Sequence, residues 1–257
     1  GLPDGTMGNS EVGHQNIGAG RVVPQESVRL TFAVRDGSFF QNPEFLKMVQ
    51  FVKEHKGRVH FMGLCSDIGV HSLLGHLYGL LELAKRNDLK DVFIHAFTDG
   101  RDSPPDSGLG YIQAVEKKAK EIGAGRIASV MGRFYAMDRD SRWDRVQKAF
   151  EALRRGKGLK ASSAEEAVRS SYEKKVTDEF IEPTCIVDEN NEPIGTINDG
   201  DGVIFFNFRG DRTREITRAF VMPDFKDFTR NVPKLEMTTF SSRVRAARMV
   251  SKVVSTA

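Results

Sequence analysis

Apolar residues recur along most of this chain at the spacing of amphipathic helices. After Asn42 and Pro43, a typical N-cap and first helical position, Phe45, Met48 and Val52 share one helical face. Four later segments show the same periodicity. We therefore expect helices over about residues 43–52, 73–84, 106–122, 143–153 and 212–220.

Short apolar runs alternate with these helices and predict β-strands at residues 58–64, 92–98, 127–131 and 203–208. Strands and helices in alternation, joined by short links, are typical of βαβ units. We therefore predict an α/β fold, with helices flanking a mostly parallel sheet. Ser163 and Glu166 have the spacing of a capping box and predict a further short helix. Residues 172–200, rich in Pro, Asn and Gly turns, predict hairpin-like or edge structure instead.

The composition of the 257 residues, 39% of them hydrophobic, suits one large domain with a substantial core. No apolar run of about 18 residues occurs, so no membrane-spanning helix and no membrane partner are expected. Cys65 and Cys185 lie far apart, which argues against a zinc site and fits the reducing cytoplasm.

The net charge of +3 has its source at the C-terminal end. Residues 241–257 hold four basic side chains and no acidic one, so the rest of the chain is close to neutral. A nucleic-acid-binding domain normally carries a basic face, and we expect no nucleic-acid partner.

Charged residues follow each of the four expected strands directly. Carboxyl ends of parallel strands share one edge of a sheet, where ligands bind in open α/β folds. Taken singly, each of these segments is also an ordinary turn or helix start. Together, guanidinium groups at one edge repel each other and favour a small anion with at least one phosphate. The candidate residues are His71, Arg101, Asp102, Arg133, Arg139, Arg209 and Arg212.

Ser10 stands in a separate candidate segment between Gly8 and Gly13. Asn9 is a good N-cap residue, and a helix that begins after it would direct free N–H groups at a phosphoryl group beside the Ser10 hydroxyl. A glycine-rich turn that merely caps a helix would have the same local sequence.

Six segments together resemble the cofactor-independent phosphoglycerate mutase family of the alkaline phosphatase superfamily. They are 7–14 (MGNSEVGH), 16–21 (NIGAGR), 66–72 (SDIGVHS), 95–102 (HAFTDGRD), 132–145 (GRFYAMDRDSRWDR) and 205–212 (FFNFRGDR). The resemblance implies interconversion of 3-phosphoglycerate and 2-phosphoglycerate in glycolysis. It also implies that Ser10 is the nucleophile that forms phosphoserine and a ligand of two divalent metal ions, usually manganese, with magnesium or cobalt as alternatives.

The same resemblance implies roles for the charged residues. Arg133 and Arg139 would hold the substrate carboxylate, and Arg209 and Arg212 the phosphoryl group. Asp102 would exchange protons with the glycerate hydroxyls, while His71 and Arg101 orient the substrate.

The chain departs from the family pattern in its metal ligands, of which Ser10 alone can be assigned. We therefore expect a fragment in three parts: residues 1–25 from a metal-binding phosphatase domain, 26–235 as the substrate-binding transferase domain, and 236–257 as an atypical basic tail. The expected partner is a small-molecule substrate, and the expected state is a monomer. Two alternatives stay open: a non-catalytic anion-binding fragment, and a related metal-dependent phosphatase or phosphomutase.

Overall fold

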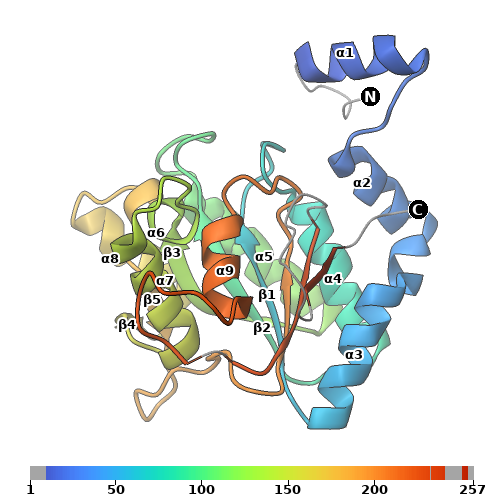
Figure 1. Cartoon of the computed structure of the whole chain (residues 1–257). Helices are drawn as coiled ribbons and strands as arrows, with labels where there is room; N and C mark the ends of the chain where they lie inside the picture. The colour runs from blue at the N-terminus through green and yellow to red at the C-terminus, as the bar shows by residue number, and fades with distance from the viewer. Residues whose placement is uncertain (1–9, 232, 241–250, 254–257) are drawn as a thin grey trace.

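The computed structural model describes residues 10–231, 233–240 and 251–253 (Figure 1). Within these residues eight strands form one sheet in the order β4-β5-β3-β2-β1-β6-β7-β8. Their bounds are β1 Val59–Leu64, β2 Val92–Thr98, β3 Arg126–Gly132, β4 Leu159–Ala161, β5 Thr184–Ile186, β6 Gly202–Phe205, β7 Glu236–Thr239 and β8 Ser251–Val253.

The sheet is mostly parallel, as predicted. β3, β2, β1, β6, β7 and β8 run in one direction, whereas β5 pairs antiparallel with β3 and parallel with β4. The central strands thus end at a common edge, formed by the residues after Leu64, Thr98, Gly132 and Phe205.

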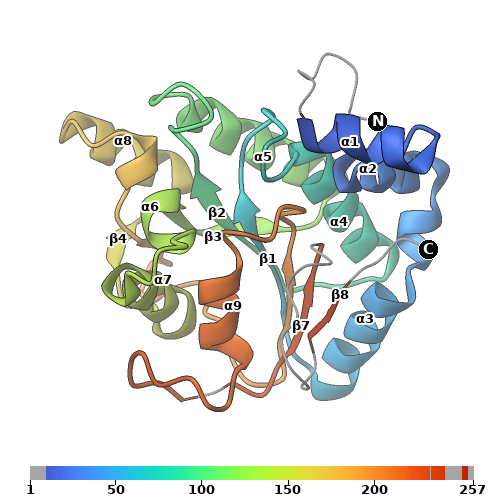
Figure 2. The same ribbon diagram turned by 45° about the horizontal axis from the view of Figure 1, so that its top comes forward.

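Helices cover both faces of this sheet (Figures 1 and 2). Their bounds are α1 Ser10–Ala19, α2 Glu26–Asp36, α3 Pro43–His55, α4 Leu74–Arg86, α5 Gly108–Ile122, α6 Arg133–Ala136, α7 Trp143–Arg155, α8 Ala164–Glu173 and α9 Arg214–Val221, with 3-10 turns η1 Ser38–Gln41 and η2 Asp178–Phe180.

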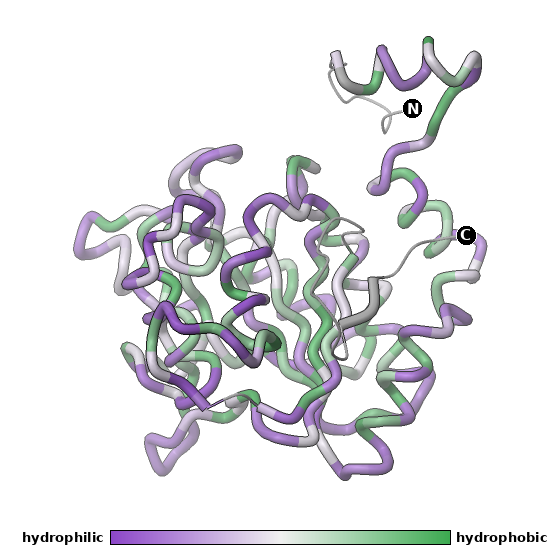
Figure 3. Tube along the Cα trace, viewed as in Figure 1, coloured by the Kyte–Doolittle hydropathy of each residue, from purple (hydrophilic) through white to green (hydrophobic). Residues whose placement is uncertain are grey.

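Two apolar cores result from the alternation of side chains along each strand. On one face Phe61 and Ile94 pack with α3, α4, α5 and α8. On the other face Met62, Phe97 and Phe205 pack with α7 and α9. Since both faces are covered, the strands are hydrophobic along their length, which Figure 3 shows as green tube in the middle of the molecule.

Local signals placed several helix starts correctly. The side chain of Asn42 accepts a hydrogen bond of 3.0 Å from Glu44 N, with Pro43 as the first residue of α3. Ser163 Oγ accepts from Glu166 N at 3.1 Å, as in a capping box. In a capping box the Glu166 carboxylate would accept a hydrogen bond from Ser163 N. Here it accepts from Ser162 N instead, at 2.7 Å, so the second hydrogen bond is made to the residue before the N-cap.

The sequence patterns did not show every element. No strand was expected at residues 159–161, which form β4. Residues 172–200 contain β5, which lies inside the sheet between β4 and β3. Both strands have only three residues, too few to show a period. A hairpin-like turn does follow at Asp188, whose N–H donates to Glu192 O at 2.9 Å.

The described residues near the two ends of the chain form α1 and the strands β7 and β8. α1 lies outside the layers around the sheet (Figure 1). Gly8 and Asn9 lie outside the described residues, as do 241–250 and 254–257 of the expected tail. β7 pairs with β6, so the sheet continues past residue 235. Among the described helices, none has the length and apolar character needed to cross a membrane.

Candidate anion-binding site

The loop after β1 is fastened to the loop after β6. Leu64 N donates to Asn207 Oδ1 at 2.9 Å, and Phe208 N donates to the carbonyl of His71 at 2.9 Å. Ser72 Oγ donates to Leu64 O at 2.5 Å and closes the β1 loop on itself. His71 is therefore held close to the residues that follow β6.

The loop after β2 is a turn built on the Asp99 side chain. Gly100 has a φ of 64°, a left-handed conformation that favours glycine. Asp99 Oδ1 accepts from Asp102 N at 3.0 Å and from Arg101 N at 3.3 Å. The turn fixes Asp102 at the edge of the sheet. The Arg101 side chain is half exposed, and its Nη1 atom lies 3.5 Å from Glu179 Oε1.

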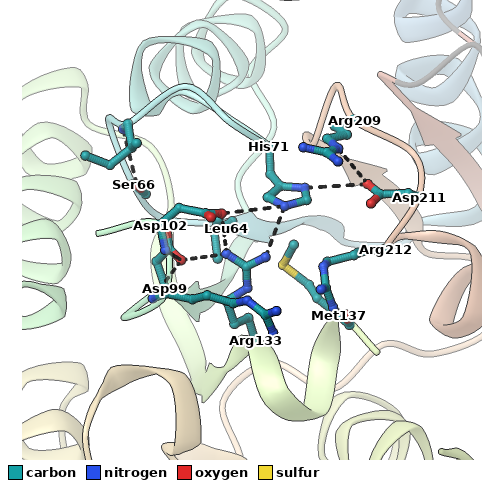
Figure 4. A network of polar contacts seen from close by, with 12 residues as sticks. Leu64, Ser66, His71, Asp99, Asp102, Arg133, Met137, Arg209, Asp211 and Arg212 are labelled. Atoms are coloured by element: carbon teal, nitrogen blue, oxygen red, sulfur yellow. Dashed lines mark hydrogen bonds and ion pairs between the residues drawn. The ribbon is translucent and has the colours of Figure 1, made fainter. Parts of the chain in front are cut away.

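Arg133, the first residue of α6, connects three of these groups (Figure 4). Its Nη1 atom donates to Asp99 Oδ1 and to Asp102 Oδ2, both at 2.6 Å, and its Nη2 atom lies 3.0 Å from His71 Nε2. Arg133 is 4% exposed. Burial alone would raise the pKa of Asp102, but the Arg133 guanidinium bound to it lowers that pKa below its usual range, so Asp102 is ionised at neutral pH.

His71 is a neutral imidazole in this environment. Burial, and then the positive charge of Arg133, lowers its pKa to about 4. Since an arginine N–H can only donate, Nε2 of His71 accepts from Arg133 and the ring proton resides on Nδ1.

The outer part of the site is formed by arginines on the loops after β3 and β6. Arg139 Nη1 donates to Asp211 Oδ2 at 2.8 Å, and Arg209 Nε lies 3.0 Å from Asp211 Oδ1. Arg212 Nη1 donates to Met137 O at 3.1 Å. Burial, and then the charges of Arg139 and other arginines, lowers the pKa of Arg212, which indicates crowded positive charge.

The structure thus brings together six of the seven strand-end residues in one region, with Arg101 at its rim. The sequence interpretation did not include Asp99 and Asp211, which it treated as an ordinary turn and helix start. The negative charges of these two carboxylates and of Asp102 partly neutralise the arginines. The repulsion between the arginines is therefore reduced by the protein itself, before any ligand binds. Their position between or beside arginines at two strand ends was the signal that could have identified them.

Ser10 lies apart from these contacts. It is exposed at the start of α1, with its Oγ 3.2 Å from His14 Nδ1. Within the described residues no hydrogen bond or ion pair joins it to the arginines. Nor do three His, Cys, Asp or Glu side chains among them gather where they could hold a metal ion. The carboxylates of the site are bound to guanidinium groups, which repel a dication, so the described residues do not fit the implied metal pair.

An open, mostly parallel α/β sheet with charged loops at its carboxyl edge is the architecture in which small ligands bind beyond the strand ends. Residues 30–242 match the family model described as the BPG-independent PGAM N-terminus. The chain belongs to this family.

Named relatives agree with this assignment. The chain is 56% identical over 230 residues to 2,3-bisphosphoglycerate-independent phosphoglycerate mutase of Acetivibrio thermocellus, covering 90% of this chain and 45% of the relative. It is 55% identical over 237 residues to the enzyme of the same name from Moorella thermoacetica, covering 92% and 46%. A crystal structure of Leishmania mexicana phosphoglycerate mutase at low cobalt concentration superposes with a TM-score of 0.84 at 37% identity, covering 91% of this chain and 44% of that one. The chain therefore spans less than half the length of these relatives.

Proposed function

We propose that this chain binds phosphoglycerate for the interconversion of 3-phosphoglycerate and 2-phosphoglycerate. The observation that carries the proposal is the network around Arg133. Buried Arg133 holds Asp102 and His71 in place, while partly exposed arginines lie next to them. Such an arrangement suits a small ligand with a phosphate at one end and a carboxylate at the other.

Each residue has a proposed part in this reaction. Arg139, assisted by Arg133, holds the carboxylate, and Arg209 and Arg212 hold the phosphoryl group. Asp102 is ionised and can accept a proton from a glycerate hydroxyl. His71 and Arg101 orient the glycerate.

Ser10 is the proposed nucleophile. The Ser10 hydroxyl gives up its proton as its oxygen attacks phosphorus, and the glycerate oxygen that leaves takes up a proton. In the return step the other glycerate hydroxyl loses its proton to Asp102 as its oxygen attacks the phosphoserine, and the Ser10 oxygen is protonated again. The Ser10 hydroxyl is exposed to solvent, which supports this role. For the longer relatives the proposal includes two divalent metal ions, with manganese as the expected metal. A glycolytic role, a cytoplasmic location and a monomeric state are part of the same proposal.

The first test is calorimetric titration of the chain with 3-phosphoglycerate. We expect binding that is lost at high salt, because arginines provide the attraction. Glycerate and inorganic phosphate serve as half-ligands and should each bind more weakly. Absence of 3-phosphoglycerate binding at low salt would contradict the proposal.

A second test separates the enzyme from the non-catalytic alternative. The chain is incubated with ³²P-labelled 3-phosphoglycerate and manganese, beside its Ser10→Ala variant. Label on the chain that the variant does not retain supports phosphoserine formation at Ser10. Binding without label favours a non-catalytic anion-binding fragment.

A further inference from the structure

Asp211 connects the loops that follow three different strands. Its Oδ2 atom accepts from Arg139, in the loop after β3, at 2.8 Å, and its Oδ1 atom lies 3.0 Å from Arg209 Nε, after β6. Oδ1 also lies 3.9 Å from His71 Nδ1, in the loop after β1 (Figure 4). One carboxylate therefore neutralises two arginines proposed to hold substrate.

Two buried atoms facing each other in this group have no hydrogen-bond partner among the described residues. They are Nδ1 of His71 and Oδ1 of Asp211, whose contact with Arg209 is an ion pair without hydrogen-bond geometry. Because Nε2 of His71 accepts from Arg133, Nδ1 carries the proton. The donor Nδ1 and the acceptor Oδ1 thus face each other at 3.9 Å, about 1 Å more than the usual length of such a hydrogen bond.

The network has a buried half and an exposed half. The side chains of Arg133 and His71 are each 3% exposed, whereas those of Arg139 and Arg209 are 43% and 49% exposed. Ion pairs exposed to this degree contribute little to stability and are replaced at low cost by a phosphate or carboxylate bound through two oxygens. Asp211, 30% exposed, lies at the boundary between the two halves.

We propose that Asp211 is an internal counter-ion of this site, which a bound anion displaces from Arg139 and Arg209 and which then accepts a hydrogen bond from Nδ1–H of His71. In this arrangement Asp211 is a positioning residue, since the anion takes over the arginines while the released carboxylate fixes the His71 ring. The inference rests on the proposed function for the identity of the anion as phosphoglycerate.

Calorimetry on Asp211→Asn tests the displacement. An internal counter-ion competes with the ligand, so the variant is expected to bind inorganic phosphate and 3-phosphoglycerate several-fold more tightly than the original chain. If Asp211 instead holds the arginines in place for the ligand, the Asp211→Asn variant should bind both ligands more weakly. Equal or weaker binding overturns the proposal. Asp199→Asn, which removes an exposed carboxylate paired with Arg154, is the matched control and should leave both affinities unchanged.

A spectroscopic signature tests the contact with His71 separately. Nitrogen-15 chemical shifts of the imidazole should place the proton on Nδ1 in the free chain. Saturating phosphate should then shift Nδ1 in the direction of a stronger hydrogen bond, and the shift should be smaller in Asp211→Asn, whose neutral amide is a weaker acceptor. A proton on Nε2, or an Nδ1 signal that phosphate leaves unchanged, overturns the proposal.

The two probes separate this inference from the proposed function. Should inorganic phosphate bind and produce the effects above while 3-phosphoglycerate does not bind, the proposed function fails and the role of Asp211 stands. Should both ligands bind but Asp211→Asn bind neither more tightly, the function stands and the counter-ion role fails.

Discussion

Arg133 and Asp99 form an ion pair with Nη1 2.6 Å from Oδ1 and only 3% and 1% of their side chains exposed. A guanidinium removed from water to this degree needs its carboxylate partner, because an uncompensated buried charge is costly. Asp99 also forms the turn that holds Asp102. The pair therefore couples the stability of the domain to the geometry of the site.

Replacement of Asp99 by Ala should destabilise the chain. Because Asp102 stays bound to Arg133, the guanidinium is not left unpaired, and the variant loses one hydrogen bond to a charged group. We expect a decrease of about 1.5–3 kcal/mol in the free energy of unfolding in urea. Asp199→Ala, which removes an exposed partner of Arg154, should cost about 1 kcal/mol or less. Similar losses in the two variants would contradict this account of Arg133.

Gly132→Ala should impair the site through the backbone. A Cβ at residue 132 would lie 2.5 Å from the carbonyl carbon of Glu179, so either η2 or the start of α6 must move, and Arg133 moves with α6. We expect a loss of about 1–3 kcal/mol in stability together with weaker phosphate binding.

Gly75→Ala is the matched control in α4, where an added Cβ meets nothing within 4 Å. Since alanine favours a helix over glycine, this variant should be stabilised by about 0.5–1 kcal/mol and should bind phosphate normally. Thermal unfolding and calorimetry on both variants give the comparison, and normal binding by Gly132→Ala would be the contrary result.

Arg139→Gln should weaken 3-phosphoglycerate binding by about 10- to 100-fold, since a hydrogen bond to a charged group contributes about 1.5–3 kcal/mol. Arg169, a somewhat more exposed arginine paired with Glu165 on α8, supplies the control Arg169→Gln. The salt dependence of binding should also decrease in the Arg139 variant alone. An unchanged affinity for 3-phosphoglycerate in Arg139→Gln would show that Arg139 does not bind this ligand.

The chain should lose stability as the pH falls from about 6.5 to about 4. Burial lowers the pKa of both His71 and His76 to about 4, against about 6.5 in an unfolded chain. The unfolded chain therefore binds protons first, so this stability is complete above about pH 6.5 and is lost below it, by about 1.4 kcal/mol per pH unit for each histidine. His60 and His95 are fully buried and act in the same direction.

Urea unfolding at pH 7 and pH 5 measures this effect. His76→Phe should reduce the difference, because the ring of His76 already lies beside Phe208 and Phe240 and phenylalanine does not titrate. A variant as sensitive to pH as the original chain would show that His76 has no part in it.

Most of the fold followed from patterns within single segments. The apolar runs and helical stripes predicted β1, β2 and β3 and the helices beside them to within a few residues. Asn42-Pro43 and Ser163 marked helix starts, because capping uses only neighbouring residues. By contrast β4, β5 and β7 were missed, since strands of three or four residues depend on pairing partners far away in the chain.

The site shows the same division. The sequence by itself determined which residue types stand after each strand and, through the parallel arrangement of βαβ units, that His71, Asp102, Arg133 and Arg139 reach one edge. Only the tertiary structure decided how these charges are paired. Asp99 and Asp211 became partners of arginines more than 30 residues away, because hydrogen bonds between loops depend on distances of a few ångströms that no local pattern encodes.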